Sequence, residues 1–247
     1  MPFTVSHAAA AAPLWRLSRG RLVLSALVVG AMAPDFEYLV HLSTRRTIGH
    51  TLPGLFVLCL PLSLVALFAW HRLVAPAWAP LTGRPAAGFG FWPWSRSAAV
   101  TASVLAGSLS HLAWDAFTHD GGLVVRHVGL LAGTVPGTGL PVYGLLQHAG
   151  TVGGAVFLAF WAHRTLGWDR PAVPGVLVVA SVAVGWVTVT GAFVNGYAHW
   201  VAGGRTTVQI LAATAVGAMA AGTVAVLVAS AALLWWRRPP PAPPTYG

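Results

Sequence analysis

The sequence predicts an all-α fold: a polytopic membrane helical bundle with about five transmembrane helices and an N-terminal helical segment that does not span. The first observation is composition, because 56% of the 247 residues are hydrophobic and the mean hydropathy is +0.72. The second is charge, because only 8% of the residues are charged, whereas soluble domains carry about 25%. The third is that five runs approach the roughly 20 apolar residues that cross a bilayer. They are residues 52–71, 98–118, 142–162, 172–193 and 207–236.

The N-terminal segment, residues 5–32, is rich in alanine and predicts helix. Arg16, Arg19 and Arg21 fall in its middle, which argues against a full crossing of the membrane. We therefore expect either two shorter helices or a helix that lies in the membrane interface or against the bundle. Pro34 follows this segment and can occupy the first position of a new short helix.

The first span, residues 52–71, is expected to be kinked, because Pro53 and Pro61 lack a backbone N–H group. Residues 72–97 are predicted to form a loop, since they are rich in proline, glycine and tryptophan. Three tryptophans of this stretch suit the interfacial belt of a membrane protein. They are Trp78, Trp92 and Trp94.

The last span, residues 207–236, is long and contains Gly217 and Gly222 among other small residues. Small residues on a membrane helix are typical of close contacts with a neighbouring helix. The sequence therefore predicts that this span packs tightly against another one.

Residues 1–238 are predicted to form a single integral membrane domain, in which residues 1–50 contribute to the functional site. Residues 239–247 form a proline-rich tail that we expect to be disordered. No positively charged region precedes the first apolar stretch, so no cleavable signal peptide is expected. Cys59 is the single cysteine, which excludes an intramolecular disulfide.

The charged residues are unbalanced: fourteen are basic, all of them arginine, and five are acidic, for a formal net charge of +9. In a membrane protein such an excess indicates loop placement and contact with anionic lipid headgroups. No basic block with interleaved aromatic residues is present, so no nucleic-acid partner is expected. The arginines that closely flank the spans place the 72–97 loop and the C-terminus in the cytoplasm. Composition indicates no particular oligomeric state.

The most informative stretch closes the second span, where His111, Asp115 and His119 recur every four residues. On a helix these three side chains lie on one face. The two histidines are about 12 Å apart along a helix axis, so one ion with bonds of about 2 Å would not reach both unless the helix bends. A carboxylate between them can bind one ion through each oxygen, so the pattern predicts two metals bridged by Asp115. The alternative is a helix that buries two hydrogen-bonded histidines and leaves Asp115 at its solvent-exposed end.

Alternating spans place further candidate metal ligands at the membrane face where this stretch ends. They belong to the N-terminal segment, precede the first span or begin the third: His7, Asp35, Glu37, His50 and His148. Histidine nitrogens and carboxylate oxygens together are the donors that zinc prefers. We therefore predict a divalent metal site, most naturally for one or two zinc ions, on the extracytoplasmic face.

Each of these candidates also has an ordinary structural explanation, which the sequence leaves open. Asp35 and Glu37 can complement the dipole of a short helix. His50 can be an ordinary residue before a helix N-cap, and His7 a surface residue of the leading helix. His148 lies inside an apolar span, where an ionisable residue indicates function, but it can also bond a neighbouring amide or carbonyl.

Five blocks of residues stand in the chain in a fixed order. They are Met1-Pro-Phe-Thr-Val-Ser-His7, Met32-Ala-Pro-Asp35-Phe-Glu-Tyr38, Gly49-His50-Thr-Leu-Pro-Gly54, Ser110-His111-Leu-Ala-Trp-Asp115-Ala-Phe-Thr-His119 and Leu146-Gln-His148. Together they resemble a bacterial family of uncharacterised membrane proteins, the domain-of-unknown-function 4184 family. The resemblance covers about the first 165 residues by motif and the remainder by hydropathy. It implies a multi-pass protein of the bacterial cytoplasmic membrane.

The order of these histidines and aspartates resembles, more distantly, that of membrane-bound metal-dependent hydrolases and of the zinc-dependent phospholipase C and single-strand nuclease superfamily. That likeness implies three zinc positions. The matching residues are Asp35, His50, His111 and Asp115 for one; His7 with Asp115 for another; and His119 with His148 for the third. Four residues after His148 stands Val152, where the soluble enzymes carry an acid, so a site with one or two ions is expected.

These observations predict a membrane-bound, zinc-type hydrolase that acts on a phosphoester or lipid-linked substrate at the membrane face. Asp35, Glu37 and Asp115 are the predicted catalytic residues, and an acid that binds no metal would serve as the base. Arg45 and Arg46 are predicted to bind the substrate phosphate, although an exposed basic loop is a slightly simpler explanation. The expected partners are the lipid bilayer and this substrate.

Two other functions stay open. The protein can be a non-enzymatic or degenerate membrane protein with a structural metal site, or a transporter with a relay of aspartate and histidine. A relay would require polar residues that continue to the other side of the membrane, whereas these spans are polar at one end only.

Overall fold

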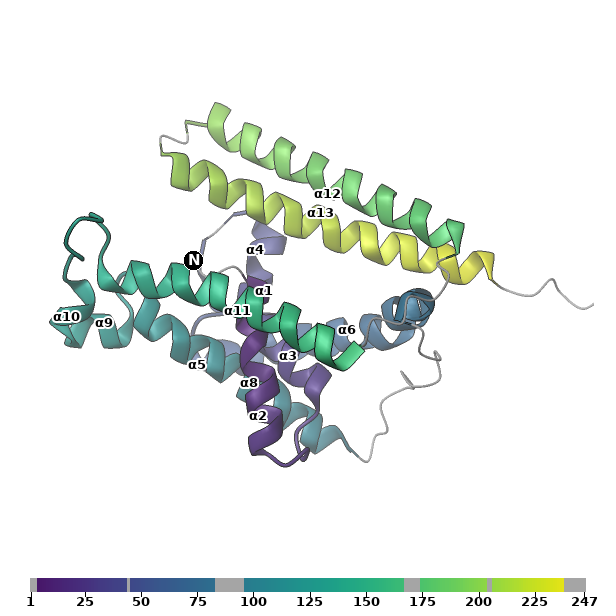
Figure 1. The fold of residues 1–247 in the computed structure, drawn as a ribbon, viewed down its shortest axis with the longest axis horizontal. Helices are drawn as coiled ribbons and strands as arrows, with labels where there is room; N and C mark the ends of the chain where they lie inside the picture. Colours follow the sequence, from purple (N-terminus) through teal and green to yellow (C-terminus); the bar gives the residue numbers. More distant parts are fainter. Residues whose placement is uncertain (1–3, 44, 83–95, 167–173, 204–205, 238–247) are drawn as a thin grey trace, which may run out of the picture. The chain divides into compact units, whose positions relative to one another are not determined.

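The structure is a computed structural model that describes residues 4–43, 45–82, 96–166, 174–203 and 206–237. Within these ranges every regular element is a helix or a helical turn, and no β-strand is present. The predicted all-α class is therefore confirmed (Figure 1). The predicted disordered tail, together with Trp92 and Trp94 of the expected interfacial belt, lies outside the described residues.

The N-terminal segment forms two helical pieces, which is the first of the two arrangements expected. The first piece comprises α1 (Thr4–His7), η1 (Ala8–Ala10) and α2 (Ala11–Leu17), and the second is α3 (Leu24–Met32). Between them Arg19 and Gly20 have positive φ angles of 53° and 74°, which turn the chain back. The turn η2 (Ala33–Asp35) and the helix α4 (Phe36–His41) follow. Pro34 stands in the first turn of η2, as predicted.

The first span is longer than expected. It is helical from Leu52 to Trp78, so the first residues of the predicted 72–97 loop are helical instead. Its parts are α5 (Leu52–Gly54), η3 (Leu55–Cys59), α6 (Leu60–Ala69), η4 (Trp70–Val74) and α7 (Ala75–Trp78), followed by η5 (Ala79–Thr82). The turns η3 and η4 are π-helical, and each is followed two residues later by a proline. A wider turn relieves the clash between a proline ring and the carbonyl four residues earlier.

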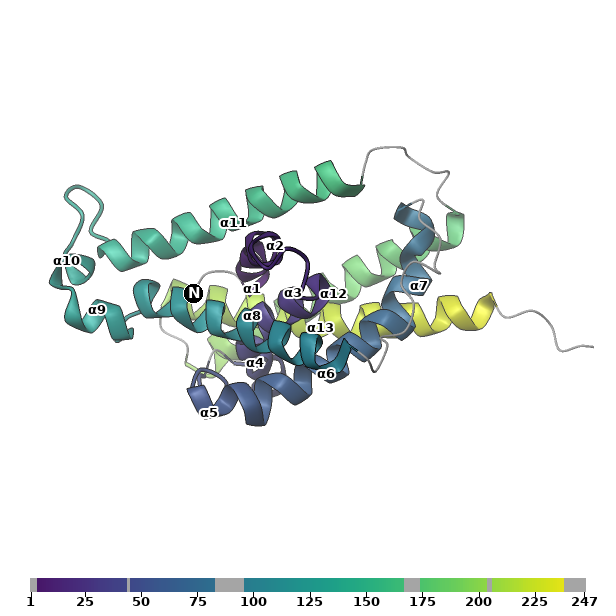
Figure 2. The ribbon, with the colours of Figure 1, turned by 90° about the horizontal axis from the view of Figure 1, so that it is seen from below.

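The long helix α8 (Ser97–Thr118) packs closely on α3. At Gly30 of α3 an added Cβ would overlap the carbonyl of Val104, and at Gly107 of α8 it would overlap the carbonyl of Leu27. The two backbones therefore touch, which fixes α8 against the segment that carries Asp35. The helices α9 (Leu123–His127), α10 (Gly129–Ala132) and α11 (Val142–Leu166) complete this part of the chain (Figure 2).

The contacts divide the chain into two compact units, one of residues 1–67 and 92–168 and the other of residues 68–91 and 169–247. In the second unit α12 (Gly175–Val201) and α13 (Thr207–Trp236) lie side by side (Figures 1 and 2). An added Cβ at Gly217 would overlap the carbonyl oxygen of Gly191, so the predicted tight contact of the last span is confirmed.

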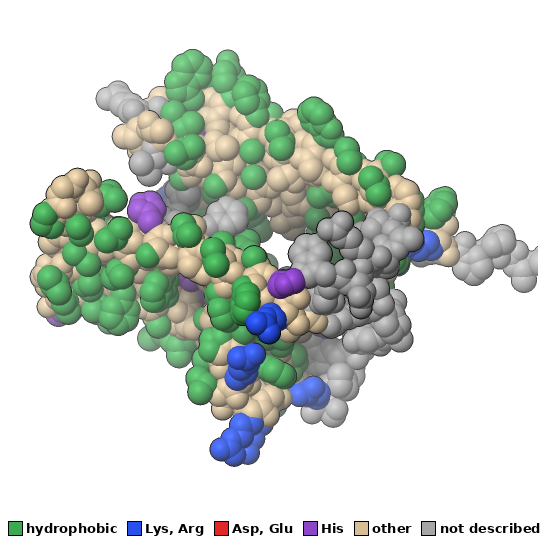
Figure 3. Space-filling model, viewed as in Figure 1, with side chains coloured by type: hydrophobic (Ala, Val, Ile, Leu, Met, Phe, Trp, Pro, Cys, Tyr) green, Lys and Arg blue, Asp and Glu red, His purple; other side chains and the backbone are tan. Residues whose placement is uncertain are grey.

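Among the described residues, four helices are long and apolar enough to cross a membrane by length and composition, and they indicate a membrane protein. They are Leu52–Trp78, Val142–Thr165, Gly175–Val201 and Gln209–Trp236. Hydrophobic side chains are spread widely over the helices in the view of Figure 3. The fifth predicted span, residues 98–118, forms α8 but is too polar to be counted with these four. Its buried polar residues include Ser103, Ser108, His111 and Asp115.

Candidate metal centre

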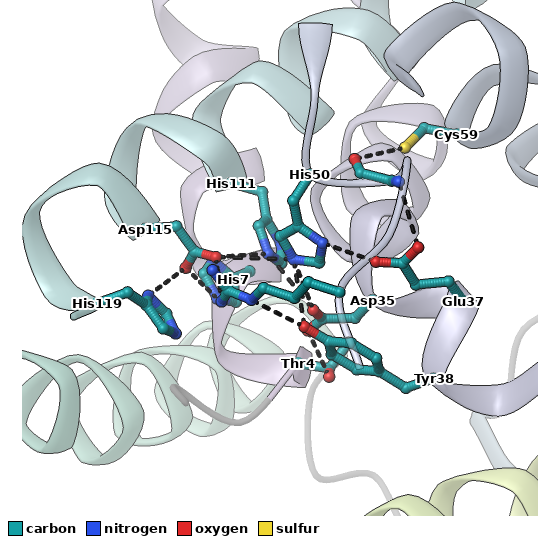
Figure 4. Close-up of polar contacts among 12 residues, drawn as sticks. Thr4, His7, Asp35, Glu37, Tyr38, His50, Cys59, His111, Asp115 and His119 are labelled. Carbon is teal, nitrogen blue, oxygen red and sulfur yellow. Dashed lines mark hydrogen bonds and ion pairs between the residues drawn. The ribbon is translucent and has the colours of Figure 1, made fainter. Parts of the chain in front are cut away.

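Six histidines and acids of the first unit meet in one cluster, to which four parts of the chain contribute (Figure 4). His7 comes from α1, Asp35 from η2 and His50 from the turn before α5. His111 and Asp115 come from α8, and His119 follows the end of that helix. Figure 4 shows their side chains pointing toward one another.

Four side chains face a common centre, which we call the first position. The Nε2 atom of His50 lies 3.3 Å from Oδ1 of Asp35 and 3.7 Å from Oδ2 of Asp115. The Nε2 atom of His111 lies 3.6 Å and 3.5 Å from the same two oxygens. A tetrahedral zinc ion with bonds of about 2 Å separates its ligand atoms by about 3.3 Å. The four distances are close to this value, and two overlapping groups of three donors could each hold an ion: His50, His111 and Asp115, and His7, Asp35 and His111.

The buried atoms at this centre have unused hydrogen-bonding capacity. Among the described residues, Oδ1 of Asp35, Nε2 of His111 and Oδ1 of Asp115 have no hydrogen-bond partner. All three side chains are at least 93% buried, and a buried polar atom without a partner costs about 1 to 3 kcal/mol. A cation at the first position would satisfy Oδ1 of Asp35 and Nε2 of His111, whereas Oδ1 of Asp115 points to the other side of that carboxylate.

The outer atoms of the same side chains are held in place. Nδ1 of His50 lies 3.0 Å from Oε1 of Glu37, and Nδ1 of His111 lies 2.7 Å from the carbonyl oxygen of Ala31. The hydroxyl of Thr4 donates to Oδ2 of Asp35 at 2.7 Å. A second ring nitrogen bound to a carboxylate or a carbonyl is the usual arrangement of a metal-binding histidine. Both Nε2 atoms are thereby directed at the centre.

Glu37 is buried beside the centre and does not face it. Its carboxylate accepts hydrogen bonds from the backbone and hydroxyl of Thr47 and from the backbone of Gly49, besides its contact with His50. These bonds hold the loop before α5 and fix the ring of His50. The contacts of Glu37 therefore favour a positioning role, whereas the sequence suggested a catalytic one.

A second position lies on the other oxygen of Asp115. Oδ1 of Asp115 is 3.2 Å from Nδ1 of His119 and 3.8 Å from Nε2 of His7. Nε2 of His119 in turn lies 3.4 Å from the amide nitrogen of Gln147 on α11. Each oxygen of Asp115 thus faces different histidines, which is the bridging geometry that the four-residue spacing predicts. His7 also stacks on His111, with ring centroids 3.7 Å apart, so the two positions adjoin.

Two further side chains, Arg46 and Tyr38, contact the donors of the centre. The guanidinium of Arg46 donates to Oδ2 of Asp115 at 2.7 Å and to the hydroxyl of Tyr38 at 3.1 Å. That hydroxyl lies 3.4 Å from Nε2 of His50. The Arg46 side chain is 32% exposed, so it connects the buried cluster with the surface.

The protonation of the N-terminal donors suits a metal. Burial and the neighbouring His111 lower the pKa of His7 to about 3, so its ring is neutral at pH 7. Burial alone would raise the pKa of Asp35, but its contact with His50 and the charge of His111 lower it. Asp35 is therefore a carboxylate. A neutral imidazole and a carboxylate are the forms that bind metal ions.

The structure brings together all but two of the site residues that the sequence suggested. His148 is exposed on α11, and its neighbour Gln147 reaches the cluster instead. Arg45 is also exposed, and only Arg46 contacts the cluster. Both remain predictions without a contact that supports them.

Three contributors were missed by the sequence reasoning: Thr4, Tyr38 and Gln147. Thr4 stands three residues before His7, and Tyr38 three residues after Asp35. Residues three apart share a helix face, so this spacing was a usable signal. Gln147 carried no such signal, because its neighbour was the more conspicuous candidate ligand.

Comparison with known proteins gives one result. A family model described as "Domain of unknown function (DUF4184)" matches residues 1–231, which include every residue of the cluster. Comparisons with curated proteins and with solved structures found no match. The more distant likeness to zinc-dependent hydrolases therefore stays a prediction. Because the match spans most of its length, the chain belongs to the DUF4184 family of domains of unknown function.

Proposed function

We propose that this protein is a membrane-bound, metal-dependent hydrolase of the zinc type, which acts on a phosphoester at the membrane face. The observation that carries the proposal is the bridging geometry of Asp115. One of its oxygens faces a position with four protein donors, and the other faces a position with three. Catalytic zinc sites have three protein ligands and leave the next coordination site to water or substrate.

In this proposal the metal ligands belong to two positions. Asp35, His50, His111 and Asp115 hold the first ion, and His7 and His119 join Asp115 at the second. An ion of this kind, when bound, polarises a phosphoryl oxygen and lowers the pKa of a bound water to about 7.

Arg46 supplies the contact with the substrate anion. Its guanidinium already lies against Asp115 and is partly exposed, so it can turn toward an incoming phosphate without leaving the centre. A planar guanidinium binds two phosphate oxygens at once. Glu37 keeps the ring of His50 in its metal-binding orientation, and Thr4 does the same for the carboxylate of Asp35.

The first position also supports a second candidate function. Four protein donors form a closed set, which is typical of structural zinc sites. A non-enzymatic membrane protein that uses the metal to hold η2, the turn before α5 and α8 together would have the same first position. The two functions differ at the second position, which a purely structural site does not need.

One experiment separates them. The purified protein is loaded with zinc in phospholipid nanodiscs, and release of phosphorylated headgroups is measured over a panel of phospholipids and lipid-linked phosphates. We expect release from wild-type protein and from Asp120→Asn, an exposed control near the end of α8. We expect none from Asp115→Asn. A metal-loaded wild-type protein that cleaves no member of the panel would leave only the structural function.

A further inference from the structure

A groove of about 780 Å³ lies in the first unit, between the N-terminal helices, α8 and α11. Its lining is mostly apolar and includes Pro13, Trp114, Phe117 and Phe157. This volume lies within the range of ligand-binding pockets. The contacts described so far do not use the groove, apart from His7, which belongs to its lining and to the second position of the centre.

One wall of the groove belongs to a candidate membrane span. That wall is α11, which is apolar enough to cross the bilayer between Val142 and Thr165. Neighbouring side chains of this helix are exposed, with Val152 at 65% and Val156 at 63%. Phe157, which lines the groove, is itself 40% exposed, so the groove opens onto the apolar surface of this helix. A hydrocarbon chain is therefore the occupant that the surroundings supply.

Three glycines of α11 shape the groove. An added Cβ at Gly150 would lie 3.0 Å from the ring of Trp114, and one at Gly154 would lie 2.8 Å from the carbonyl oxygen of Ser6. At these two positions glycine allows α8 and α1 to approach α11. At Gly153 an added Cβ would meet no atom within 4 Å, so this glycine leaves the space open.

The polar end of the groove determines where the headgroup of a bound lipid would lie. His7 is a donor of the second position, whose remaining coordination site is open in the proposed function. The hydroxyl of Ser6 is turned away, because it donates to the carbonyl oxygen of Thr151. A lipid whose chain lies in the groove would therefore present its headgroup at His7.

We propose that the groove binds the hydrocarbon chain of a membrane phospholipid and thereby places its phosphate at the metal centre. This assignment names the substrate class of the proposed hydrolase and rests on that function for the role of the phosphate. Binding of the chain itself rests only on the groove.

The test uses full-length protein in nanodiscs of phosphatidylglycerol that carries a diazirine on one acyl chain. After irradiation, mass spectrometry locates the labelled peptides. We expect labelling of the segments that contain Trp114 and Phe157, and at least a tenfold loss of this labelling in Gly153→Phe. Gly185→Phe is the matched control, because Gly185 also lies in open space on an apolar helix, α12. Its labelling of the groove segments should equal that of wild type.

Gly153→Leu fills the groove with a smaller side chain. If the phenylalanine variant is unstable, we expect the same loss of labelling in this variant. Equal labelling in wild type and in both Gly153 variants would overturn the groove assignment, whatever the activity. Loss of labelling in these variants, together with no hydrolysis by the wild-type protein, would support lipid binding in the groove and contradict the hydrolase function. In an active protein, the Gly153 variants should raise KM for a long-chain phospholipid and leave KM for a water-soluble phosphodiester unchanged.

Discussion

At the scale of single residues, Asp115 connects the two halves of the centre, because its oxygens face different histidines. We expect Asp115→Asn, which keeps the size of the side chain, to lose at least one bound ion per protein. The measurement is elemental analysis after purification and dialysis against a weak chelator. Asp120→Asn, which changes an exposed aspartate nearby, should retain the wild-type metal content. Equal metal content in the two variants would contradict the bridging role.

Glu37 gives a prediction about pH. Burial alone would raise its pKa, but the hydrogen bonds from Thr47 lower it below the ordinary value. A carboxyl group with a lowered pKa in the folded state stabilises the protein above its ordinary pKa. That contribution is lost as the pH falls through the folded-state pKa. The thermal midpoint of metal-free protein in detergent should therefore fall between pH 6 and pH 3.

The variant Glu37→Gln isolates this contribution. It should be less stable than wild type at pH 7, by about 1 to 3 kcal/mol, because buried donors lose a charged acceptor. The difference should narrow as the pH falls, since protonation removes the same charge from wild type. A difference that stays constant down to pH 3 would show that Glu37 does not titrate in this way.

At the scale of helices, α12 and α13 depend on glycine at their contact. Gly217→Ala should destabilise the protein by about 1 to 3 kcal/mol, because the new methyl group would overlap the carbonyl oxygen of Gly191. Gly185→Ala makes the same change in open space on α12. It should be neutral or stabilising by up to about 1 kcal/mol, since alanine favours helix. Unfolding in detergent measures both, and equal effects would contradict the close packing.

Helix α8 shows what hydropathy can and cannot indicate. Its ends were predictable to within a residue, because an apolar run and its polar flanks are local features. The side of α8 that is buried was not predictable, because Gly107 and Ser108 contact α3 only when the two helices pack together. The contact of Gln147 on α11 with His119 was not predictable for the same reason. A shift of one residue turns the side chain by about 100°, which is the difference between His148 and Gln147.

The cluster was predictable as a set of residue types and only partly as a set of contacts. The position of Asp115 between His111 and His119 followed from local spacing along one helix. The contacts of Thr4 with Asp35 and of Arg46 with Asp115 join residues 31 and 69 positions apart. Such pairs depend on how helices pack, and no periodic pattern in a single sequence records them.

At the scale of the whole molecule, the number of crossings is open to a direct test. Leu67 packs with Val104 near the start of α8, whereas Leu55 packs with Leu112 near its end. The helix α8 therefore runs antiparallel to the first span and covers the same depth, although its composition is more polar. We expect α8 to cross the membrane.

Two single-cysteine variants measure this, in a background that carries Cys59→Ser. Arg96→Cys and Asp120→Cys place thiols on exposed residues at the two ends of α8. A membrane-impermeant maleimide should label them from opposite sides. Labelling from one side only would reduce the crossings to the four helices that are apolar enough by composition.

The hydrogen bond from Ser6 to Thr151 has a consequence for biosynthesis, because its partners are 145 positions apart. A ribosome that adds about 5 to 20 residues per second needs about 7 to 30 seconds to make the intervening chain. Throughout that interval the N-terminal helix lacks its contact with α11, because α11 has not yet been synthesised. The contact between the N-terminal helix and α11 therefore forms late in synthesis, after every residue of the cluster from His7 to His119 has been made.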